Sequence, residues 1–115
     1  MKLPLFEIAT VDQEKVVGYL MNPSHRYGAS KSRFFAEFGF SRNNWQALAR
    51  ALQGHAATHE VARLRQTPFG TRYEIDGTLA SPDGRNPRVR TIWQWDGKSP
   101  APRLITAHPL EAVTS

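Results

Sequence analysis

Hydrophobic residues in this chain change their spacing once, near residue 55. This change predicts helices in the first half of the chain and strands in the second. In the segment 45–52 they recur at every third or fourth position, which is typical of one face of an α-helix. In the segment 89–95 they alternate with polar residues, which is typical of a strand with one buried and one solvated face. We therefore expect an α+β fold, with N-terminal helices packed on one face of a roughly four-stranded antiparallel sheet.

Three helices are expected in a helical part that spans residues 1–55. The pattern Thr10-Val11-Asp12-Gln13 matches a capping box, so the first helix should start there and end at Asn22-Pro23. The second helix should begin near Ser30 and end at Gly39. Its inward-facing residues would be Phe34, Phe35 and Phe38.

The third helix has a clean amphipathic pattern. Ser41 is a good N-cap, the apolar stripe follows it, and Gly54 is expected to end the helix. A sheet part should then span residues 57–109, with turns at Pro82-Asp83-Gly84 and Asp96-Gly97. The expected strands lie near residues 59–65, 69–76, 89–95 and 103–108.

Length and composition bound the class of protein. The 115 residues should make one domain, residues 1–115, around a single hydrophobic core. The chain contains no cysteine, which excludes disulfides and thiolate metal sites and fits a cytoplasmic protein. The N-terminus lacks the apolar run and cleavage site of a signal peptide, and no segment is long enough to span a membrane. We expect a cytoplasmic protein that does not bind membranes.

Basic residues are concentrated in two segments. The chain has 15 Lys and Arg against 10 Asp and Glu, a net charge of +5. Residues 22–50 hold five cations against one carboxylate, and so do residues 85–103. Such a pattern favours an anionic partner, of which nucleic acid is the commonest. The alternative is a basic, soluble surface with no specific partner.

Several kinds of chemistry have no motif in this sequence. It contains no Cys/His metal spacing, no glycine-rich phosphate loop and no nucleophile elbow. Its acidic residues are scattered, without the close pair that glycoside hydrolysis or a two-metal site needs. We therefore expect neither a metal nor a cofactor.

The turn between the first two helices holds the leading candidate for catalysis, His25. An imidazole can exchange a proton near neutral pH, and neighbouring cations favour its neutral, basic form. Together with Arg26, Lys31 and Arg33 it would hold a phosphodiester and move the proton of a ribose hydroxyl. Tyr27 would stack on a base, donate a proton or lie at the edge of the core. The alternative for His25 is a structural role, capping the loop.

The third expected strand carries a second set of candidates. Arg88 and Arg90 share one face with Gln94, while Trp93 lies on the other face. Exposed arginines and tryptophans suit single-stranded RNA, which is bound by stacking and guanidinium contacts. Buried tryptophans would belong to the core instead.

The other histidines divide into two groups. Thr106 and His108 share a face of the last expected strand, where a second histidine would supply the acid of an acid–base pair. His55 and His59 flank the end of the third helix and are expected to be structural or solvated.

Four blocks of this chain carry a resemblance to a known family. The blocks are Leu20-Met21-Asn22-Pro23-Ser24-His25 with Gly28, Lys31-Ser32-Arg33-Phe34-Phe35 and Gly39-Phe40; Gly70-Thr71-Arg72-Tyr73; Arg90-Thr91-Ile92-Trp93; and Arg103-Leu104-Ile105-Thr106-Ala107-His108-Pro109. In this order they resemble a small bacterial family, domain of unknown function 6883. The resemblance covers nearly the whole chain and implies no established activity.

The expected layout of helices and sheet is also similar to the barnase–EndoU–colicin–RelE group of metal-independent ribonuclease toxins. This resemblance implies RNA cleavage through a 2′,3′-cyclic phosphate by mixtures of His, Lys, Arg, Thr and Tyr. The family pattern tends to a tyrosine where this chain has His108. The matching residue types here are His25, Lys31, Arg90, Thr91, Thr106 and His108.

Three hypotheses follow for the function. The first is a toxin-like ribonuclease held in check by a cognate antitoxin or immunity-type protein. The second is a non-catalytic RNA- or DNA-binding module, and the third is a protein-interaction domain of a two-gene pair. In the first, the catalytic residues would be His25, Lys31, Thr91 and Thr106. The substrate-binding residues would be Arg26, Tyr27, Arg33, Arg88, Arg90, Trp93 and His108.

Overall fold

A computed structural model describes residues 1–110, and it confirms the α+β class. Short helices and one long helix come first and four strands follow, as the change of period near residue 55 predicts. The main elements are α1 (Gln13–Lys15), α2 (Ala29–Glu37), α3 (Trp45–Thr58), β1 (Val61–Thr67), β2 (Gly70–Thr78), β3 (Arg88–Trp95) and β4 (Arg103–Pro109).

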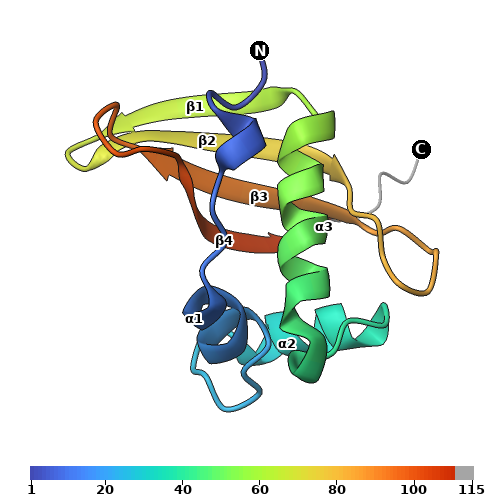
Figure 1. Cartoon of the computed structure of the whole chain (residues 1–115). Helices are drawn as coiled ribbons and strands as arrows, with labels where there is room; N and C mark the ends of the chain where they lie inside the picture. Colours follow the sequence, from blue (N-terminus) through green and yellow to red (C-terminus); the bar gives the residue numbers. More distant parts are fainter. Residues whose placement is uncertain (111–115) are drawn as a thin grey trace.

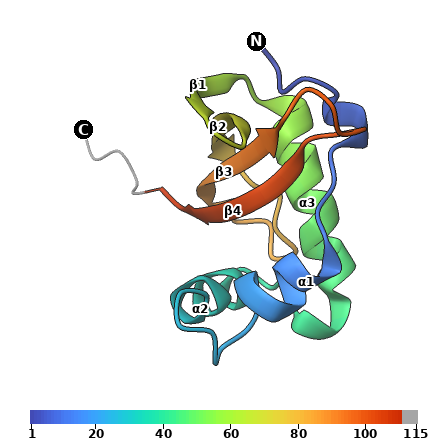
Figure 2. The same ribbon diagram turned by 90° about the vertical axis from the view of Figure 1, so that its left-hand side faces the viewer.

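The four strands form one antiparallel sheet in the order β1-β2-β3-β4. Helix α3 crosses one face of it, while α1 and α2 lie beyond the edge strand β4 (Figure 1). The opposite face has no helix over it in the described part of the chain (Figure 2). Side chains along each strand alternate between the two faces of the sheet, and those on one face lie under α3. The fully buried ones include Ile75, Val89, Thr91 and Trp93.

The first helix ends just before Asn22-Pro23, as predicted, but its start differs from the prediction. Asp12 is the N-cap of α1 and makes no side-chain cap bond, so the capping box does not form. The reason is that Thr10 is extended and bridges β4: its N–H donates to the Pro102 carbonyl at 2.9 Å. A π-helical turn over Val16–Leu20 then continues α1, and its backbone bond from the Met21 N–H is 2.7 Å long.

Of the three phenylalanines in α2 and at its C-cap, one is fully buried. Phe35 is fully buried, whereas Phe34 and Phe38 are half-buried and pack against each other with ring centroids 5.1 Å apart. Gly39 takes a φ of 100°, a conformation that favours glycine, and so ends the helix as predicted.

Helix α3 is longer than its pattern suggests. Ser41 accepts a bond from the Asn43 N–H at 3.2 Å, but this caps a 3₁₀ turn that leads into α3. Gly54 lies inside the helix, which ends only at Thr58. A lone glycine does not stop a helix whose apolar stripe continues to Ala56 in the core. The helical part therefore extends three residues past its expected end, and the first strand begins at Val61.

The Gly54→Ala variant is expected to be more stable than the wild type by about 0.5–1 kcal/mol. Gly54 is exposed, has ordinary helical geometry, and a methyl group there meets no atom within 4 Å. Alanine therefore lowers the entropy of the unfolded chain without strain. Urea unfolding followed by circular dichroism measures the change, and a less stable variant would contradict it.

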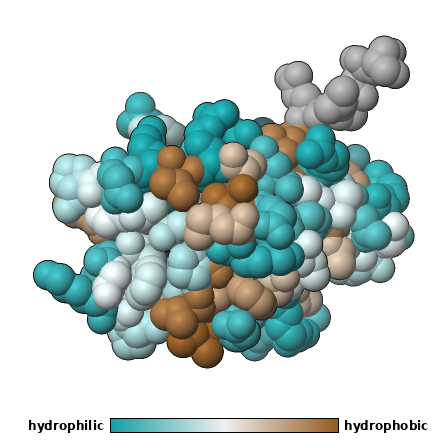
Figure 3. Space-filling view, turned by 90° about the horizontal axis from the view of Figure 1, so that it is seen from above, coloured by the Kyte–Doolittle hydropathy of each residue, from teal (hydrophilic) through white to brown (hydrophobic). Residues whose placement is uncertain are grey.

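Hydrophobic surface is divided into separate areas on the side that includes the edge strand β1, where hydrophilic residues lie between them (Figure 3). Within residues 1–110, no helix has the length and apolar character that a membrane span needs.

Candidate functional site

A groove of about 740 Å³ lies between β4 and residues 12–27, and we call it the β4 groove. One wall is the turn of α1 and the π-helix, and the other wall is the first half of β4. The groove mixes both signs of charge with two aromatic rings. Its charged and polar side chains include Asp12, Glu14, Lys15, Tyr19, His25, Tyr27, Arg103 and Thr106.

Tyr19 is at the centre of the contacts around this groove. Its hydroxyl lies 2.9 Å from the Thr106 hydroxyl, which ties the helical turn to β4. The His25 ring meets the Tyr19 ring edge-on with centroids 4.9 Å apart. Two ammonium groups lie near the same ring, Lys15 Nζ at 5.3 Å and Lys31 Nζ at 5.6 Å from its centroid. We call these five residues the Tyr19 cluster.

The sequence analysis missed Tyr19, Lys15 and Arg103. One signal was available for two of them, because Lys15 and Tyr19 stand four residues apart and so share a helix face. The contact of Tyr19 with Thr106, 87 positions further on, is a consequence of the tertiary fold.

His25 caps the loop and also lines the groove. Its Nδ1 accepts bonds from the N–H groups of Tyr27 and Gly28, both at 3.0 Å. A ring nitrogen that accepts two bonds carries no proton, so the proton of the neutral ring is on Nε2. His25 therefore presents an N–H donor, whereas the sequence analysis expects a base.

Of the other predicted residues in this segment, Arg26, Tyr27, Lys31 and Arg33, only Tyr27 lines the groove. Lys31 Nζ donates to the Tyr27 carbonyl at 3.3 Å, which holds its charge close to the Tyr19 ring. The Arg26 guanidinium lies 5.3 Å from the centre of the exposed Tyr27 ring. Arg33 is exposed on α2 and is not among the residues that line the groove.

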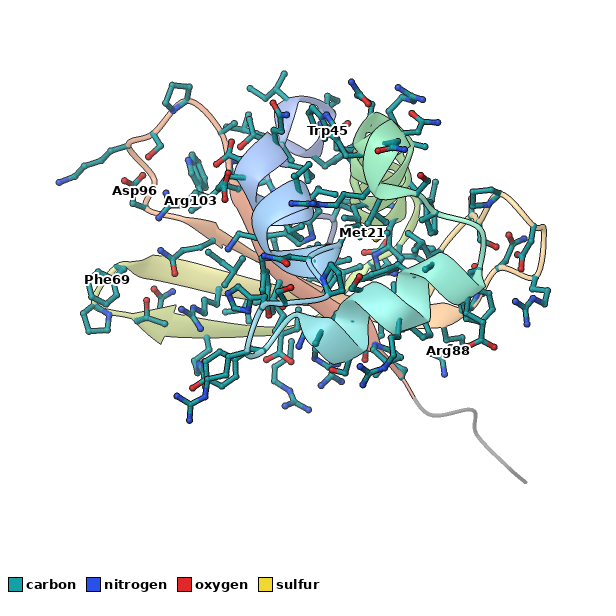
Figure 4. The ribbon with its side chains drawn as sticks, turned by 90° about the horizontal axis from the view of Figure 1, so that it is seen from below. Met21, Trp45, Phe69, Arg88, Asp96 and Arg103 are labelled. Carbon is teal, nitrogen blue, oxygen red and sulfur yellow. The ribbon has the colours of Figure 1, made fainter. Side chains whose placement is uncertain are left out.

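The two predicted arginines of β3, Arg88 and Arg90, do not meet this cluster. Arg90 is bound to Asp76 through two bonds of 2.7 and 2.9 Å and lies 3.4 Å from Glu74, all on the face that no helix covers. The hydrogen bond from Arg90 holds the pKa of Asp76 below its usual value and raises the pKa of the guanidinium. Arg88 and Arg103 lie at opposite ends of the sheet (Figure 4). The expected site shared by His25, Lys31 and the sheet arginines is thus not formed.

Thr91 and Trp93 are fully buried, so neither meets a substrate in this structure. Trp93 Nε1–H donates to the Thr91 hydroxyl at 2.9 Å, and that hydroxyl lies 3.0 Å from His55 Nδ1. His55 Nε2–H completes the chain by donating to the Gly77 carbonyl at 3.1 Å. Burial lowers the pKa of His55 to about 4, so the ring is neutral at pH 7. The structural role expected for His55 agrees with this network.

His108 lies opposite Arg90 in the strand ladder, and its Nδ1–H donates to the Pro109 carbonyl at 3.3 Å. It is not one of the residues that line the β4 groove. Thr106, by contrast, lines the groove directly. In residues 1–110, no group of three or more His, Cys, Asp or Glu side chains is placed to hold a metal ion.

Two comparisons with known proteins give a match, and one gives none. A solved chain from the contact-dependent growth inhibition toxin–immunity protein complex of Klebsiella pneumoniae 342 has a TM-score of 0.71 to this structure. The match covers 93% of this chain and 97% of that chain at 14% identity, and it shows a shared fold. No curated protein matches the sequence. The model of a domain of unknown function, DUF6883, matches residues 2–111, and the chain therefore belongs to the DUF6883 family.

Proposed function

We propose that this protein is a metal-independent ribonuclease of the toxin type, which cleaves RNA in the β4 groove. The Tyr19 cluster carries the proposal, because a histidine, two lysines and two hydroxyls from distant segments meet around Tyr19, and all of them except Lys31 line the groove. Such a set of donors and cations suits a phosphodiester. The shared fold with a chain of a toxin–immunity complex supports the same class of function.

In this proposal His25 acts on the phosphate as a hydrogen-bond donor. Its Nε2–H is free to point at a non-bridging oxygen because Nδ1 is already held by the N–H groups of Tyr27 and Gly28. A neutral imidazole can stabilise developing negative charge in this way. Lys31 and Arg103 add positive charge, and the Thr106 hydroxyl positions the phenol of Tyr19.

The reaction needs a separate group to accept a proton. The ribose 2′-hydroxyl attacks phosphorus, its proton leaves, and the 5′-oxygen departs to give a 2′,3′-cyclic phosphate. Glu14 is the carboxylate in the groove that suits the role of acceptor, since its side chain folds over Gly18 toward the groove. The open groove leaves protonation of the departing 5′-oxygen to water.

The His25→Asn variant is expected to cleave RNA at least about 100-fold more slowly than the wild type. An asparagine oxygen can still accept the N–H bonds two and three residues further on, so the loop is kept while the Nε2–H is lost. The measurement is cleavage of a labelled single-stranded RNA in EDTA, beside a thermal melt. His25→Ala loses both functions and should also melt earlier.

Arg63→Ala is the matched control, because it removes an exposed cation from β1 at the other edge of the sheet. It should cleave like the wild type, and expression should be toxic for both of these proteins but not for His25→Asn. A folded His25→Asn variant that cleaves at the wild-type rate would refute the role of His25. RNA binding that weakens steeply with salt but gives no turnover would support a nucleic-acid-binding module instead.

We also propose a cognate immunity-type protein as the partner. In a protein-interaction domain without catalysis, the wild type would leave RNA intact in EDTA while the product of a neighbouring gene co-purifies with it. That pair of results would overturn the ribonuclease proposal in favour of the interaction domain.

A further inference from the structure

A second groove of about 690 Å³ adjoins the first, and we call it the hairpin groove. Arg103 and Ile105 line both grooves, so the two meet on β4. From there the hairpin groove extends toward the β1–β2 and β3–β4 turns, where Phe69, Asp96 and Arg103 lie at one end of the sheet (Figure 4). An extended ligand in the β4 groove has a path into the hairpin groove.

The hairpin groove carries an exposed aromatic ring on a well-held turn. Phe69 is 73% exposed, the highest value among the large hydrophobic residues of the described chain. The Thr67 hydroxyl fixes its turn, accepting from the Phe69 N–H at 3.1 Å and donating to the Gly70 carbonyl at 2.7 Å. Gly70 has a φ of 123°, and a side chain there would meet the backbone of Trp95. The backbone of the turn is therefore packed against the end of β3, and this fixes the position from which the exposed ring projects.

The opposite turn of the groove is equally ordered. The Asp96 carboxylate accepts bonds from the Lys98 N–H at 2.8 Å and from the Ser99 N–H and hydroxyl at 2.7 and 2.9 Å. These bonds lower the pKa of Asp96 to about 2, so the group stays ionised and its oxygens are used within the turn. Trp95 Nε1–H also donates a hydrogen bond to this turn, to the Ser99 carbonyl at 2.9 Å.

Cations and an amide lie between the two turns. Arg72 donates through Nε to Gln94 Oε1 at 3.2 Å, and the hydrogen bonds among the described residues do not use its two terminal nitrogens. Arg103 adds a second guanidinium at the junction with the β4 groove. An aromatic ring with two guanidiniums and an amide is the set of groups that binds a nucleobase and its phosphate.

We propose that the hairpin groove binds a base of single-stranded RNA, stacked on Phe69, next to the nucleotide whose phosphate lies in the β4 groove. Arg72 and Gln94 meet the edge of that base, and Arg103 binds the phosphate between the two nucleotides. The proposal rests on the proposed function and extends it from a phosphate site to a site that spans two neighbouring nucleotides.

The test measures affinity for a fluorescein-labelled single-stranded RNA hexamer of mixed sequence, in a His25→Asn background that keeps the RNA intact. Adding Phe69→Ala is expected to weaken binding about 5- to 100-fold, the loss that follows removal of one base-stacking ring. The salt dependence of binding should not change, because no charge is removed. Phe69→Trp should restore affinity, whereas Leu64→Ala, which removes another exposed apolar side chain, should have no effect.

The outcomes separate this proposal from the ribonuclease proposal. Wild-type cleavage with equal hexamer affinity for Phe69→Ala and its parent would overturn the base subsite alone. Absence of both cleavage and hexamer binding in the wild type would overturn the proposed function and the subsite with it. Weaker binding by Phe69→Ala that Phe69→Trp does not restore would also count against stacking. Thermal melts show that each variant is folded, as expected for an exposed position.

Discussion

Replacing Thr91→Val should lower the free energy of unfolding by about 2–6 kcal/mol, although valine has nearly the same shape. The Thr91 hydroxyl accepts from Trp93 Nε1–H and donates to His55 Nδ1, and all three side chains are buried. Valine would leave one donor and one acceptor without a partner in the core, each at a cost of about 1–3 kcal/mol. Urea unfolding at pH 7.5, followed by tryptophan fluorescence and circular dichroism, measures the loss.

The conservative change at the same position is the control. Thr91→Ser keeps the hydroxyl and removes one methyl group, which should cost about 1 kcal/mol. If the two variants lost the same stability, the hydrogen-bond chain would contribute nothing and packing alone would explain both losses. A larger loss in the valine variant attributes the difference to the hydroxyl.

The spacing of the hydrophobic residues and the residue types typical of turns predicted most of the fold, because these signals are local. The alternation in β3 places Val89, Thr91 and Trp93 under α3, as expected for a sheet covered on one face. The ends of elements were harder to predict. Thr10 matches a capping motif, yet its backbone pairs with β4, and no local pattern reports a partner 93 positions away.

The candidate site could be predicted only in part. The segment that holds His25 and Lys31 stands out by composition, and Thr106 was predicted from its place on the last strand, whereas Tyr19 and Arg103 were not predicted. The two basic segments suggested that Arg90 would share a site with His25. Instead, the Arg90 guanidinium is hydrogen-bonded to Asp76, its cross-strand neighbour. Charge along the sequence does not tell which face of a sheet a residue occupies or which carboxylate lies opposite.

Cross-strand pairing and burial also explain why residues of β3 were predicted to act on RNA although the structure places them elsewhere. Thr91 and Trp93 match residue types that act on RNA, but the alternation that makes β3 a strand also turns both side chains into the core. The same alternation puts Arg90 on the uncovered face. Residue type and strand register therefore have to be considered together before a site is assigned to a sheet.

Acidification from pH 6.5 to about pH 4 should destabilise the protein by about 3 kcal/mol through His55 alone. Burial lowers the pKa of this histidine from 6.5 to about 4 in the folded state. Between these two values the unfolded chain binds a proton that the folded chain does not. The stability that depends on a neutral His55 is therefore fully present above pH 6.5 and is lost progressively as the pH falls through this range.

Urea unfolding at half-unit steps from pH 4.5 to pH 7.5 measures this slope. Carboxylates with lowered pKa values, such as Asp76 and Asp96, lose their contribution to stability only below the usual pKa of an aspartate. They therefore affect stability at a lower pH than His55 does. In His55→Asn the slope between pH 4.5 and pH 6.5 should largely disappear, whatever the absolute stability of the variant. An equal slope in the two proteins would mean that another group takes up the proton and that His55 is not the acid-sensitive element of this core.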